Sequence, residues 1–155
     1  MKILIFSDSH GNCIEMFMAV KRHEPDLLLH LGDCVKDAYA ISVEFPELPV
    51  RYIKGNNDFN TNAPEFDEFV VEGVRFFMTH GHKYYVKSTT ANAINAAISR
   101  NANVLLYGHT HSPVCVEYEG LHIINPGSVG FGKKTYAELV VENGAVKCEI
   151  FICIK

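Results

Sequence analysis

The sequence predicts an α/β fold in which the sheet is partly antiparallel. Three apolar runs in the first third of the chain alternate with helical segments, which is typical of parallel strands joined by crossovers. Two later runs, Phe66–Val71 and Val74–Met78, flank Glu72-Gly73, a two-residue hairpin turn that adds antiparallel strands. The 155 residues are 48% hydrophobic, which suits a single domain, 1–155, with a substantial core.

Three buried strands are expected in the first third of the chain. Lys2–Phe6, Leu27–Leu31 and Val50–Ile53 are short, continuous apolar runs, as in central parallel strands covered on both faces. His30 lies inside the second run, so we expect it to be a core histidine satisfied by its neighbours rather than a metal ligand.

Three helices are also expected. The first is indicated by the helical spacing of Ile14, Phe17, Met18 and Val20. The second covers Val35–Phe45 and ends before Pro46. The third is the alanine-rich segment Ser88–Ser99, capped near residues 88–90.

The remaining apolar runs predict strands. They are Val104–Tyr107, Val114–Tyr118, Leu121–Ile124, Thr135–Val141 and Ala145–Ile154. Glu119-Gly120 and Asn143-Gly144 are expected to join the last two pairs as hairpin turns.

Short polar motifs follow five of the predicted strands. They are Ser7–Asn12, Gly32-Asp33, Gly55–Asp58, Thr79–His82 and Gly108–His111. Taken singly, each has an ordinary explanation as a turn or as a helix N-cap, for which Ser9 and Asn12 are candidates. Because open α/β sheets place their sites at the carboxyl ends of strands, the five motifs together indicate one shared site.

Two of the motifs carry paired side chains. In an extended segment, the spacing of Asp8 and His10 places both side chains on the same face. Gly108 lets the backbone turn sharply, so that His109 and His111 can point into a single cleft. A carboxylate and several imidazoles in one place are suited to binding a metal ion.

The five motifs supply three oxygen donors and four imidazoles. They are Asp8, Asp33, Asn56, His10, His80, His109 and His111. Seven ligands exceed the four of one zinc site, but they suit two metals bridged by a carboxylate, for which Asp33 is the natural choice. Two metals about 3.5–4 Å apart can hold a hydroxide between them and clamp a phosphoryl centre. The predicted chemistry is therefore hydrolysis of a phosphoester.

Composition excludes several other classes of protein. The net charge of −4 comes without any Lys/Arg block, so no long nucleic acid is expected as a partner. No segment approaches the ~20 apolar residues of a membrane span, and the N-terminus is not a signal peptide. The five cysteines form no CxxC pair, which argues for free thiols in the cytoplasm. Cys13 and Cys34 are either soft ligands or, as is more common, small buried residues.

The order of these motifs resembles the calcineurin-like metallophosphoesterase superfamily. The Asp-Ser-His-Gly-Asn opening at residues 8–12 and the loop Asn125–Val129 resemble its compact YfcE/MJ0936-type phosphodiesterase branch. The resemblance covers nearly the whole chain. It implies a two-sheet mixed β-sandwich flanked by helices, a four-layer arrangement with both metals at the sheet ends.

The resemblance also divides the ligands between two metals. One metal would take Asp8, His10, Asp33 and His111, and the other Asp33, Asn56, His80 and His109. The family commonly works with manganese, and nickel, iron and zinc are alternatives. Its members often form dimers or tetramers, so a homo-oligomer is expected here. The bridging hydroxide would attack phosphorus in line, while His109 and the metals stabilise the added negative charge.

One position departs from the family pattern. Many members have a histidine after the asparagine ligand that is thought to protonate the leaving alkoxide, whereas this chain has Asn57. Small phosphodiesters with good leaving groups are therefore favoured over phosphomonoesters. His82 is a candidate substitute acid, with a surface histidine as the alternative. Asn12, Asn56 and Asn57 are candidates for binding the substrate phosphate, although Asn12 and Asn57 could instead serve as caps and turns.

Two further features are open to more than one reading. The glycine-rich loop Asn125–Gly130 could direct backbone N–H groups at an anion, but a purely conformational role is favoured. Tyr84, Tyr85 and Phe131 could form an apolar rim for an aromatic group, but packing roles are favoured.

Three functions fit the sequence. The first is a dinuclear metal-dependent phosphodiesterase, which the complete ligand set supports. The second is a catalytically weak or inactive protein-binding scaffold, because a eukaryotic retromer subunit resembles this fold but has lost catalysis. The third is a metal-dependent hydrolase of another bond, such as an amide. We expect the first.

Overall fold

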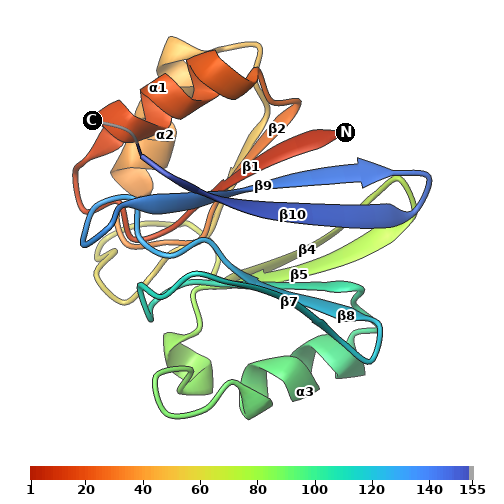
Figure 1. Ribbon diagram of the computed structural model, residues 1–155. Helices are drawn as coiled ribbons and strands as arrows, with labels where there is room; N and C mark the ends of the chain where they lie inside the picture. Colours follow the sequence, from red (N-terminus) through yellow and green to blue (C-terminus); the bar gives the residue numbers. More distant parts are fainter. Residues whose placement is uncertain (154–155) are drawn as a thin grey trace.

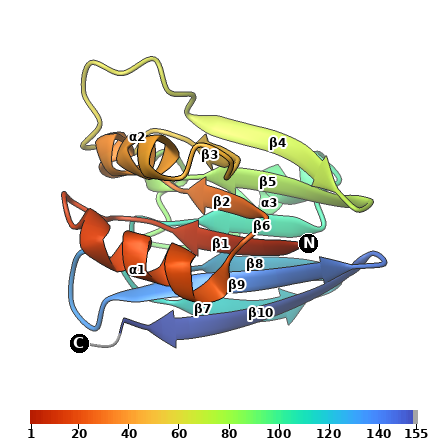
Figure 2. The ribbon, with the colours of Figure 1, turned by 90° about the horizontal axis from the view of Figure 1, so that it is seen from above.

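The N-terminal apolar run forms the centre of the first sheet. In the computed structural model, which describes residues 1–153, β1 (Lys2–Phe6) pairs in parallel with β2 (Leu27–His30). β2 pairs in parallel with β3 (Val50–Tyr52). On its other side β1 pairs antiparallel with β9 (Thr135–Glu142), which in turn pairs with β10 (Ala145–Ile152). The strand order is β10-β9-β1-β2-β3 (Figure 2).

The middle of the chain forms the second sheet. Its strands are β4 (Phe66–Val71), β5 (Val74–Thr79), β6 (Val104–Tyr107), β7 (Val114–Tyr118) and β8 (Leu121–Asn125). Their order is β4-β5-β6-β8-β7, in which β5, β6 and β8 run parallel. The hairpins β4–β5 and β7–β8 add an antiparallel strand at each edge, which confirms the mixed character expected from their turns.

Helices cover the outer faces of both sheets. α1 (Cys13–His23) and α2 (Val35–Glu44) lie on the first sheet, and α3 (Ala91–Ser99) lies on the second (Figures 1 and 2). A short 3-10 helix, η1 (His82–Tyr84), follows β5. The four-layer sandwich that the family resemblance implied is confirmed. No helix within residues 1–153 is long and apolar enough to cross a membrane.

The main core lies between the two sheets. Ile3 and Ile5 of β1 face the second sheet, whereas Leu4 and Phe6 face α1 and pack near Met16. Because successive side chains of a strand alternate between faces, a strand that is covered on both faces must be apolar throughout. This explains the continuous apolar run at the N-terminus.

The predicted elements are confirmed with shifts of a few residues at their ends. β2 and β3 each end one residue earlier than expected, and α3 begins at Ala91 rather than Ser88. β10 ends at Ile152, and Ile154, which was expected to end this strand, lies outside the described residues. All five cysteines are free thiols.

The four residues that indicated α1 divide between its two faces. Val20 is buried and Phe17 packs partly buried against the same cluster, whereas Ile14 and Met18 are 69% and 54% exposed. Met16 and Ala19 complete the buried face. The helix is confirmed, but only two of the four residues lie on the face that packs.

The start of α1 differs as well. Asn12 occupies its N-cap position, yet within the described chain its side chain makes no capping hydrogen bond. Ser9, the other candidate cap, instead places its hydroxyl 3.0 Å from His30 Nε2. The beginning of the helix is therefore fixed by the packing of the site loop rather than by a side-chain cap.

His30 is fully buried at the end of β2, as predicted for a core histidine. The backbone N–H of Gly32 donates to its Nδ1, which leaves its Nε2–H to donate to the Ser9 hydroxyl. Burial lowers the pKa of His30 to about 4, even though nearby carboxylates oppose this shift. The neutral ring therefore connects β2 to the loop after β1.

This burial predicts a stability that falls with acidification. An unfolded His30 takes up a proton below about pH 6.5, whereas the folded one remains neutral down to about pH 4. Between these values the unfolded state binds more protons, so the free energy of unfolding should decrease by up to about 3 kcal/mol as the pH falls. Urea unfolding of the chelator-treated wild type and His30→Gln at pH 7 and pH 4 measures this. Equal pH dependence in the two proteins would contradict it, and His30→Asn serves as a second uncharged replacement.

Candidate metal centre

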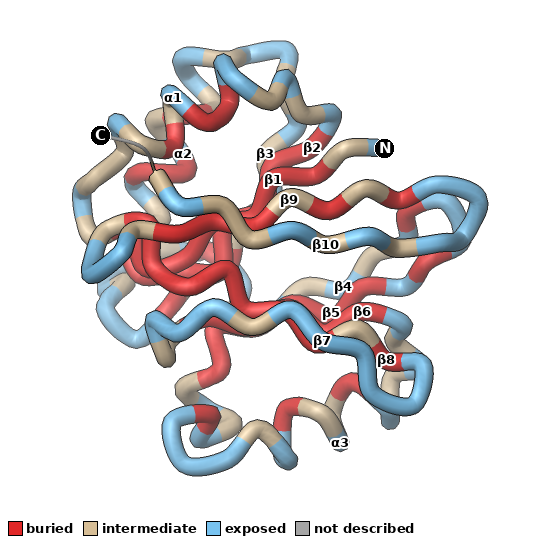
Figure 3. The backbone as a smooth tube through the Cα atoms, viewed as in Figure 1, coloured by how far each residue is buried: buried red, intermediate tan, exposed pale blue. Residues whose placement is uncertain are grey.

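The five polar motifs meet at one edge of the two sheets. They follow the carboxyl ends of β1, β2, β3, β5 and β6, which lie on the left in Figure 1. Although these segments are loops, much of their chain is buried (Figure 3). Ser7, Asp8 and Ser9 are fully buried, and Asp33 is only 2% exposed. The motifs therefore converge as expected, in a place where charged groups need specific partners.

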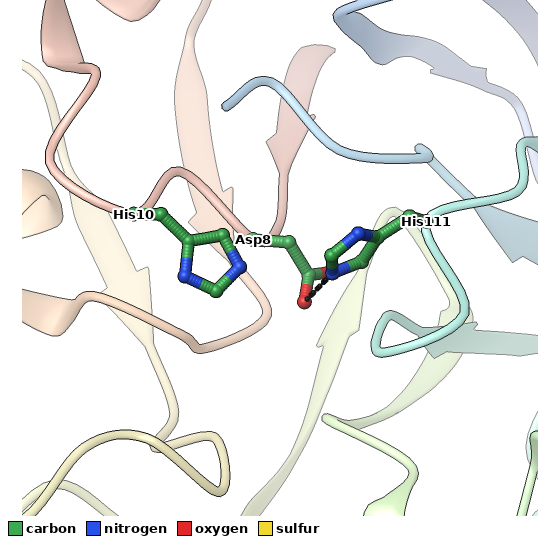
Figure 4. A group of neighbouring side chains, drawn as sticks. All are labelled: Asp8, His10 and His111. Atoms are coloured by element: carbon green, nitrogen blue, oxygen red, sulfur yellow. Dashed lines mark hydrogen bonds and ion pairs between the residues drawn. The ribbon is translucent and has the colours of Figure 1, made fainter. Parts of the chain in front are cut away.

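The first group consists of Asp8, His10 and His111, with ligand atoms that all lie within 4.8 Å of one another (Figure 4). His111 Nε2 lies 3.1 Å from Asp8 Oδ1. The other carboxylate oxygen, Oδ2, accepts hydrogen bonds from the Ser7 hydroxyl at 2.6 Å and from the His109 backbone N–H at 3.0 Å. Asp8 Oδ1 is thereby directed at the imidazoles.

The second group consists of Asp33, His80 and His109, also within 4.8 Å. His80 Nδ1 donates to the Leu31 carbonyl at 2.7 Å. Its Nε2 lies 3.1 Å from Asn56 Oδ1 and 3.5 Å from Asp33 Oδ2. Both neighbours of Nε2 are oxygen acceptors. Because the proton of a neutral His80 is on Nδ1, its Nε2 would carry a lone pair that faces these oxygens. This arrangement requires either a proton on Nε2 or a shared cation.

The two groups adjoin each other at His80. Its Nε2 lies 3.9 Å from Asp8 Oδ1, which belongs to the first group. Asp33, the expected bridge, is grouped with His80 and His109. The partition of the imidazoles is the one expected from the family resemblance, with His10 and His111 on one side and His80 and His109 on the other.

The charges of the second group favour a cation. Burial alone would raise the pKa of Asp33, but hydrogen bonds from His80 and Asn57 outweigh it and hold that pKa well below its usual range. Burial would lower the pKa of His80, but the carboxylates of Asp33 and Asp8 outweigh it and raise that pKa. Burial, followed by the charges of His80 and Lys87, lowers the pKa of His109 to about 4, so its ring is neutral and able to ligate.

A buried nitrogen in the first group provides a direct test of fit. His10 Nε2 is inaccessible to solvent and has no hydrogen-bond partner among residues 1–153. Buried ring nitrogens are almost always paired, so an unpaired one beside a carboxylate and a second imidazole is suited to a metal ion. Mixed oxygen and imidazole donors fit divalent transition metals such as manganese, iron, nickel and zinc.

The backbone of the site is mostly left-handed. The φ angles are 53° at Asp8, 48° at His10, 57° at Asp33, 67° at His109 and 57° at His111. The extended geometry expected for Asp8 and His10 is therefore wrong, although the two side chains do reach one group. Non-glycine residues in this region are uncommon and strained, and they cluster at functional sites. The strain is offset by the hydrogen bonds that hold these loops.

Asn57 and Asn56 differ in their contacts. The Asn57 backbone N–H and side-chain Nδ2 donate to the two Asp33 carboxylate oxygens at 2.9 and 2.7 Å. Its side-chain amide thus orients Asp33. Asn56 Oδ1 instead faces His80 Nε2 beside the second group, which suits a ligand.

His82 lies at the start of η1, next to the second group. Its ring centroid is 5.4 Å from that of His80 and 6.1 Å from that of His109. Burial, followed by the charges of His80 and Lys83, lowers the pKa of His82. A ring that is neutral at pH 7 is a weak proton donor, which counts against His82 as the general acid.

The loop Asn125–Gly130 supports the first group. Ser128 Oγ donates to the Asp8 carbonyl at 2.8 Å, and Asn125 Nδ2 donates to the Gly108 carbonyl at 3.0 Å. These contacts support the conformational role that was favoured for the loop. Phe131, just beyond it, packs its ring edge-on to His10 and stacks on His111, with centroids 4.8 and 5.8 Å apart.

The two tyrosines for which packing was favoured over a place at the rim have different environments. Tyr84 packs edge-on against Phe77 on the outer face of the second sheet, whereas Tyr85 is 70% exposed. The packing role favoured for all three aromatic residues therefore holds for Tyr84 and Phe131 but not for Tyr85.

Asp58 is a positioning residue whose role the sequence did not reveal. Its Oδ2 accepts backbone N–H groups of Asp33 and Gly55, both at 2.8 Å. Its Oδ1 accepts those of Cys34 at 3.1 Å and Val35 at 2.9 Å. One carboxylate thus connects the loop after β2 to the loop after β3. Its place in the Gly55–Asp58 motif was the available signal, but a turn residue explained that place equally well.

Comparison with known proteins agrees with this arrangement. Residues 1–144 match the calcineurin-like phosphoesterase superfamily domain. The probable metallophosphoesterase YsnB of Bacillus subtilis (strain 168) is 32% identical over 157 residues, which cover 97% of this chain and 90% of YsnB. The phosphodiesterase MJ0936 of Methanocaldococcus jannaschii is 29% identical over 174 residues, which cover 92% of this chain and 100% of MJ0936. The family expected from the motifs is the one that matches.

A solved structure shares the fold. The crystal structure of a conserved protein from Streptococcus pneumoniae TIGR4, described as a predicted phosphoesterase, has a TM-score of 0.82 and 25% sequence identity. The alignment covers 97% of this chain and 88% of that chain. The similarity therefore includes both sheets and the edge at which the motifs meet.

The contacts of Asp58 predict a large effect of a small change. In Asp58→Asn, an amide NH₂ replaces one carboxylate oxygen and faces backbone N–H donors, which costs about 1–3 kcal/mol of folding stability. Because Asp33 is displaced, the affinity for manganese should fall about 10- to 100-fold. Urea unfolding and calorimetric manganese titration measure the two effects. Asp67→Asn is the matched control, since Asp67 pairs with Arg51 on the surface and should change stability by less than about 1 kcal/mol. Equal effects of the two variants would contradict the role of Asp58.

Proposed function

Because this chain belongs to the calcineurin-like phosphoesterase superfamily, we propose that it is a phosphodiesterase that requires two divalent metal ions. The observation that carries the proposal is the pair of adjoining ligand groups at the sheet edge, Asp8-His10-His111 and Asp33-His80-His109. The unpaired nitrogen of His10 and the acceptor-facing nitrogen of His80 both support it.

In this proposal Asp8, His10 and His111 would hold the first metal, and His80, His109 and Asn56 the second. Asp33 would be shared between the two sites, because its carboxylate is buried, ionised and held beside the junction at His80. Manganese is the proposed metal, since mixed oxygen and imidazole donors accept it and the ligand set contains no thiolate.

When bound, two divalent cations would acidify a water molecule shared between them into the nucleophilic hydroxide and neutralise charge on the phosphate. The chain itself supplies orientation. Asn57 fixes both oxygens of Asp33, and the backbone N–H of His109 together with the Ser7 hydroxyl fixes Asp8. The ring of His109, which is neutral, borders the place where negative charge grows during attack at phosphorus.

The proposed substrates are small phosphodiesters with good leaving groups. The position after Asn56 is Asn57, whose side-chain amide is hydrogen-bonded to Asp33. Because an amide is not an acid at neutral pH, it cannot protonate a leaving alkoxide. The lowered pKa of His82 makes that ring a poor replacement. A diester whose leaving group departs without protonation is therefore favoured over a phosphomonoester. Cytoplasmic location, suggested by the five free thiols, and assembly into dimers or tetramers stay predictions.

The metal requirement leads to a direct prediction. Protein stripped with a chelator should not hydrolyse bis(p-nitrophenyl) phosphate, and added manganese should restore turnover. Diphenyl phosphate, a diester whose leaving phenolate is more basic, should react roughly 10²-fold more slowly or slower still, because general-acid assistance of that size is missing. Initial rates of p-nitrophenol and phenol release measure both. Two bound manganese ions without any turnover would overturn the proposed activity, and equal rates for the two diesters would overturn the account of the leaving group.

The bridging assignment predicts the behaviour of Asp33→Ala. Removing this carboxylate should abolish diesterase activity and the binding of at least one of the two manganese ions. Calorimetry gives the number of ions bound, and bis(p-nitrophenyl) phosphate gives the rate. Asp67→Ala, which removes a carboxylate on the surface of β4, should keep both properties. An active Asp33→Ala protein that binds two ions would exclude Asp33 as the bridge.

A further inference from the structure

A cavity of about 550 Å³ lies directly beside the first ligand group. His10 and Asn57 form its inner wall, so it opens onto the metal centre. The loop between β3 and β4 and the start of α2 form its outer walls, and Figure 2 shows this loop passing beside α2. The volume is within the range of small-molecule sites. A cavity of equal volume between the far ends of α1 and α2 is lined by none of the candidate ligands.

The cavity contains a cation with no partner. Lys36, the second residue of α2, lines it and is exposed, and no carboxylate within residues 1–153 lies at ion-pair distance from it. Lys54 and Lys83, by contrast, both pair with Glu65. The carboxylate of Asp58, which also borders the cavity, is occupied by four backbone N–H groups. Lys36 is therefore available to an anionic group of a ligand.

The cavity also contains an exposed aromatic ring. Phe59 is 80% exposed, although a free phenyl ring loses hydrophobic stabilisation in water. Phe131, the other exposed phenylalanine near the site, already packs against His10 and His111. Asn60 and Thr61 beside Phe59 add polar groups that can form hydrogen bonds. An aromatic ring with polar neighbours is suited to stacking a heterocyclic base.

We propose that this cavity is the specificity pocket and that it takes the nucleoside part of a phosphodiester substrate. The base stacks on Phe59, and a second phosphate on the nucleoside pairs with Lys36. This inference rests on the proposed function and specifies its substrate class. In the reaction, water adds across one P–O ester bond, so that the leaving alcohol takes a proton and the nucleoside keeps the new phosphomonoester.

Synthetic esters that share a p-nitrophenolate leaving group test whether the Phe59 ring stacks on the base. Wild type should prefer the p-nitrophenyl ester of thymidine 5′-phosphate over methyl p-nitrophenyl phosphate. The ratio of the two kcat/KM values should fall about 10-fold in Phe59→Ala and recover in Phe59→Tyr. Tyr118→Ala, which removes an exposed ring from the distant strand β7, should keep the wild-type ratio. No wild-type preference, or a ratio unchanged in Phe59→Ala, would overturn the role of Phe59.

A second pair of esters tests whether Lys36 pairs with a second phosphate on the nucleoside. A 3′-phosphate added to the thymidine ester should raise kcat/KM in wild type, and Lys36→Met should reduce that gain about 5-fold. Lys147→Met on β10 is the matched control, since this lysine is exposed and far from the cavity. A gain that persists in Lys36→Met would exclude Lys36 as the phosphate partner.

Binding separates this inference from the proposed function. Thymidine 3′,5′-bisphosphate has no diester bond, so calorimetry can follow its binding without turnover. We expect Phe59→Ala to weaken this binding about 10-fold. If wild type cleaves none of the diesters but binds the bisphosphate through Phe59, the proposed function fails and the pocket stands. If it cleaves all diesters alike and does not bind the bisphosphate, the pocket fails and the function stands.

Discussion

The arrangement of the site loops depends on the burial of two carboxylates. Asp8 is fully buried and Asp33 is 2% exposed, and burying charges of the same sign near each other is expensive unless each one is paired. The donors to Asp8 include the backbone N–H of His109, which lies in the loop after β6 of the other sheet. The packing of one sheet on the other therefore completes the environment of Asp8, and a site of this kind cannot form from either sheet alone.

The small size of two glycines lets the loops of the site approach one another closely. A Cβ atom on Gly108 would overlap the Ser7 hydroxyl, and one on Gly55 would overlap the carboxylate of Asp33. Neither glycine has a positive φ, so a special backbone conformation does not explain them. The sharp turn expected at Gly108 thus gave the right location for the wrong reason. The left-handed backbone lies instead at five of the candidate ligands, where hydrogen bonds between loops hold it: Asp8, His10, Asp33, His109 and His111.

The sequence predicted those features that are encoded locally. Continuous apolar runs identified β1 and β2, and short glycine turns identified the hairpins, because both signals lie within a few residues. The contacts of Asn57 and Asp58 could not be predicted in this way, since both residues reach groups about 24 residues away in the sequence. An amide and a carboxylate in a turn satisfy nearby backbone in most proteins. Only the arrangement of the loops shows that here they hold Asp33 and the start of α2.

The chemistry of position 57 connects the site to the pocket beside it. The side-chain amide there donates a hydrogen bond to Asp33, beside the one from the Asn57 backbone N–H, but it has no proton to give to a leaving group. In the proposed enzyme, position 57 therefore orients Asp33 but supplies no acid, and the rate would depend on the leaving group of the substrate. Selection among diesters then relies on binding the remainder of the substrate. Phe59 and Lys36 lie where such binding energy can act, because they line the same cavity as Asn57 and His10, which border the candidate metal centre.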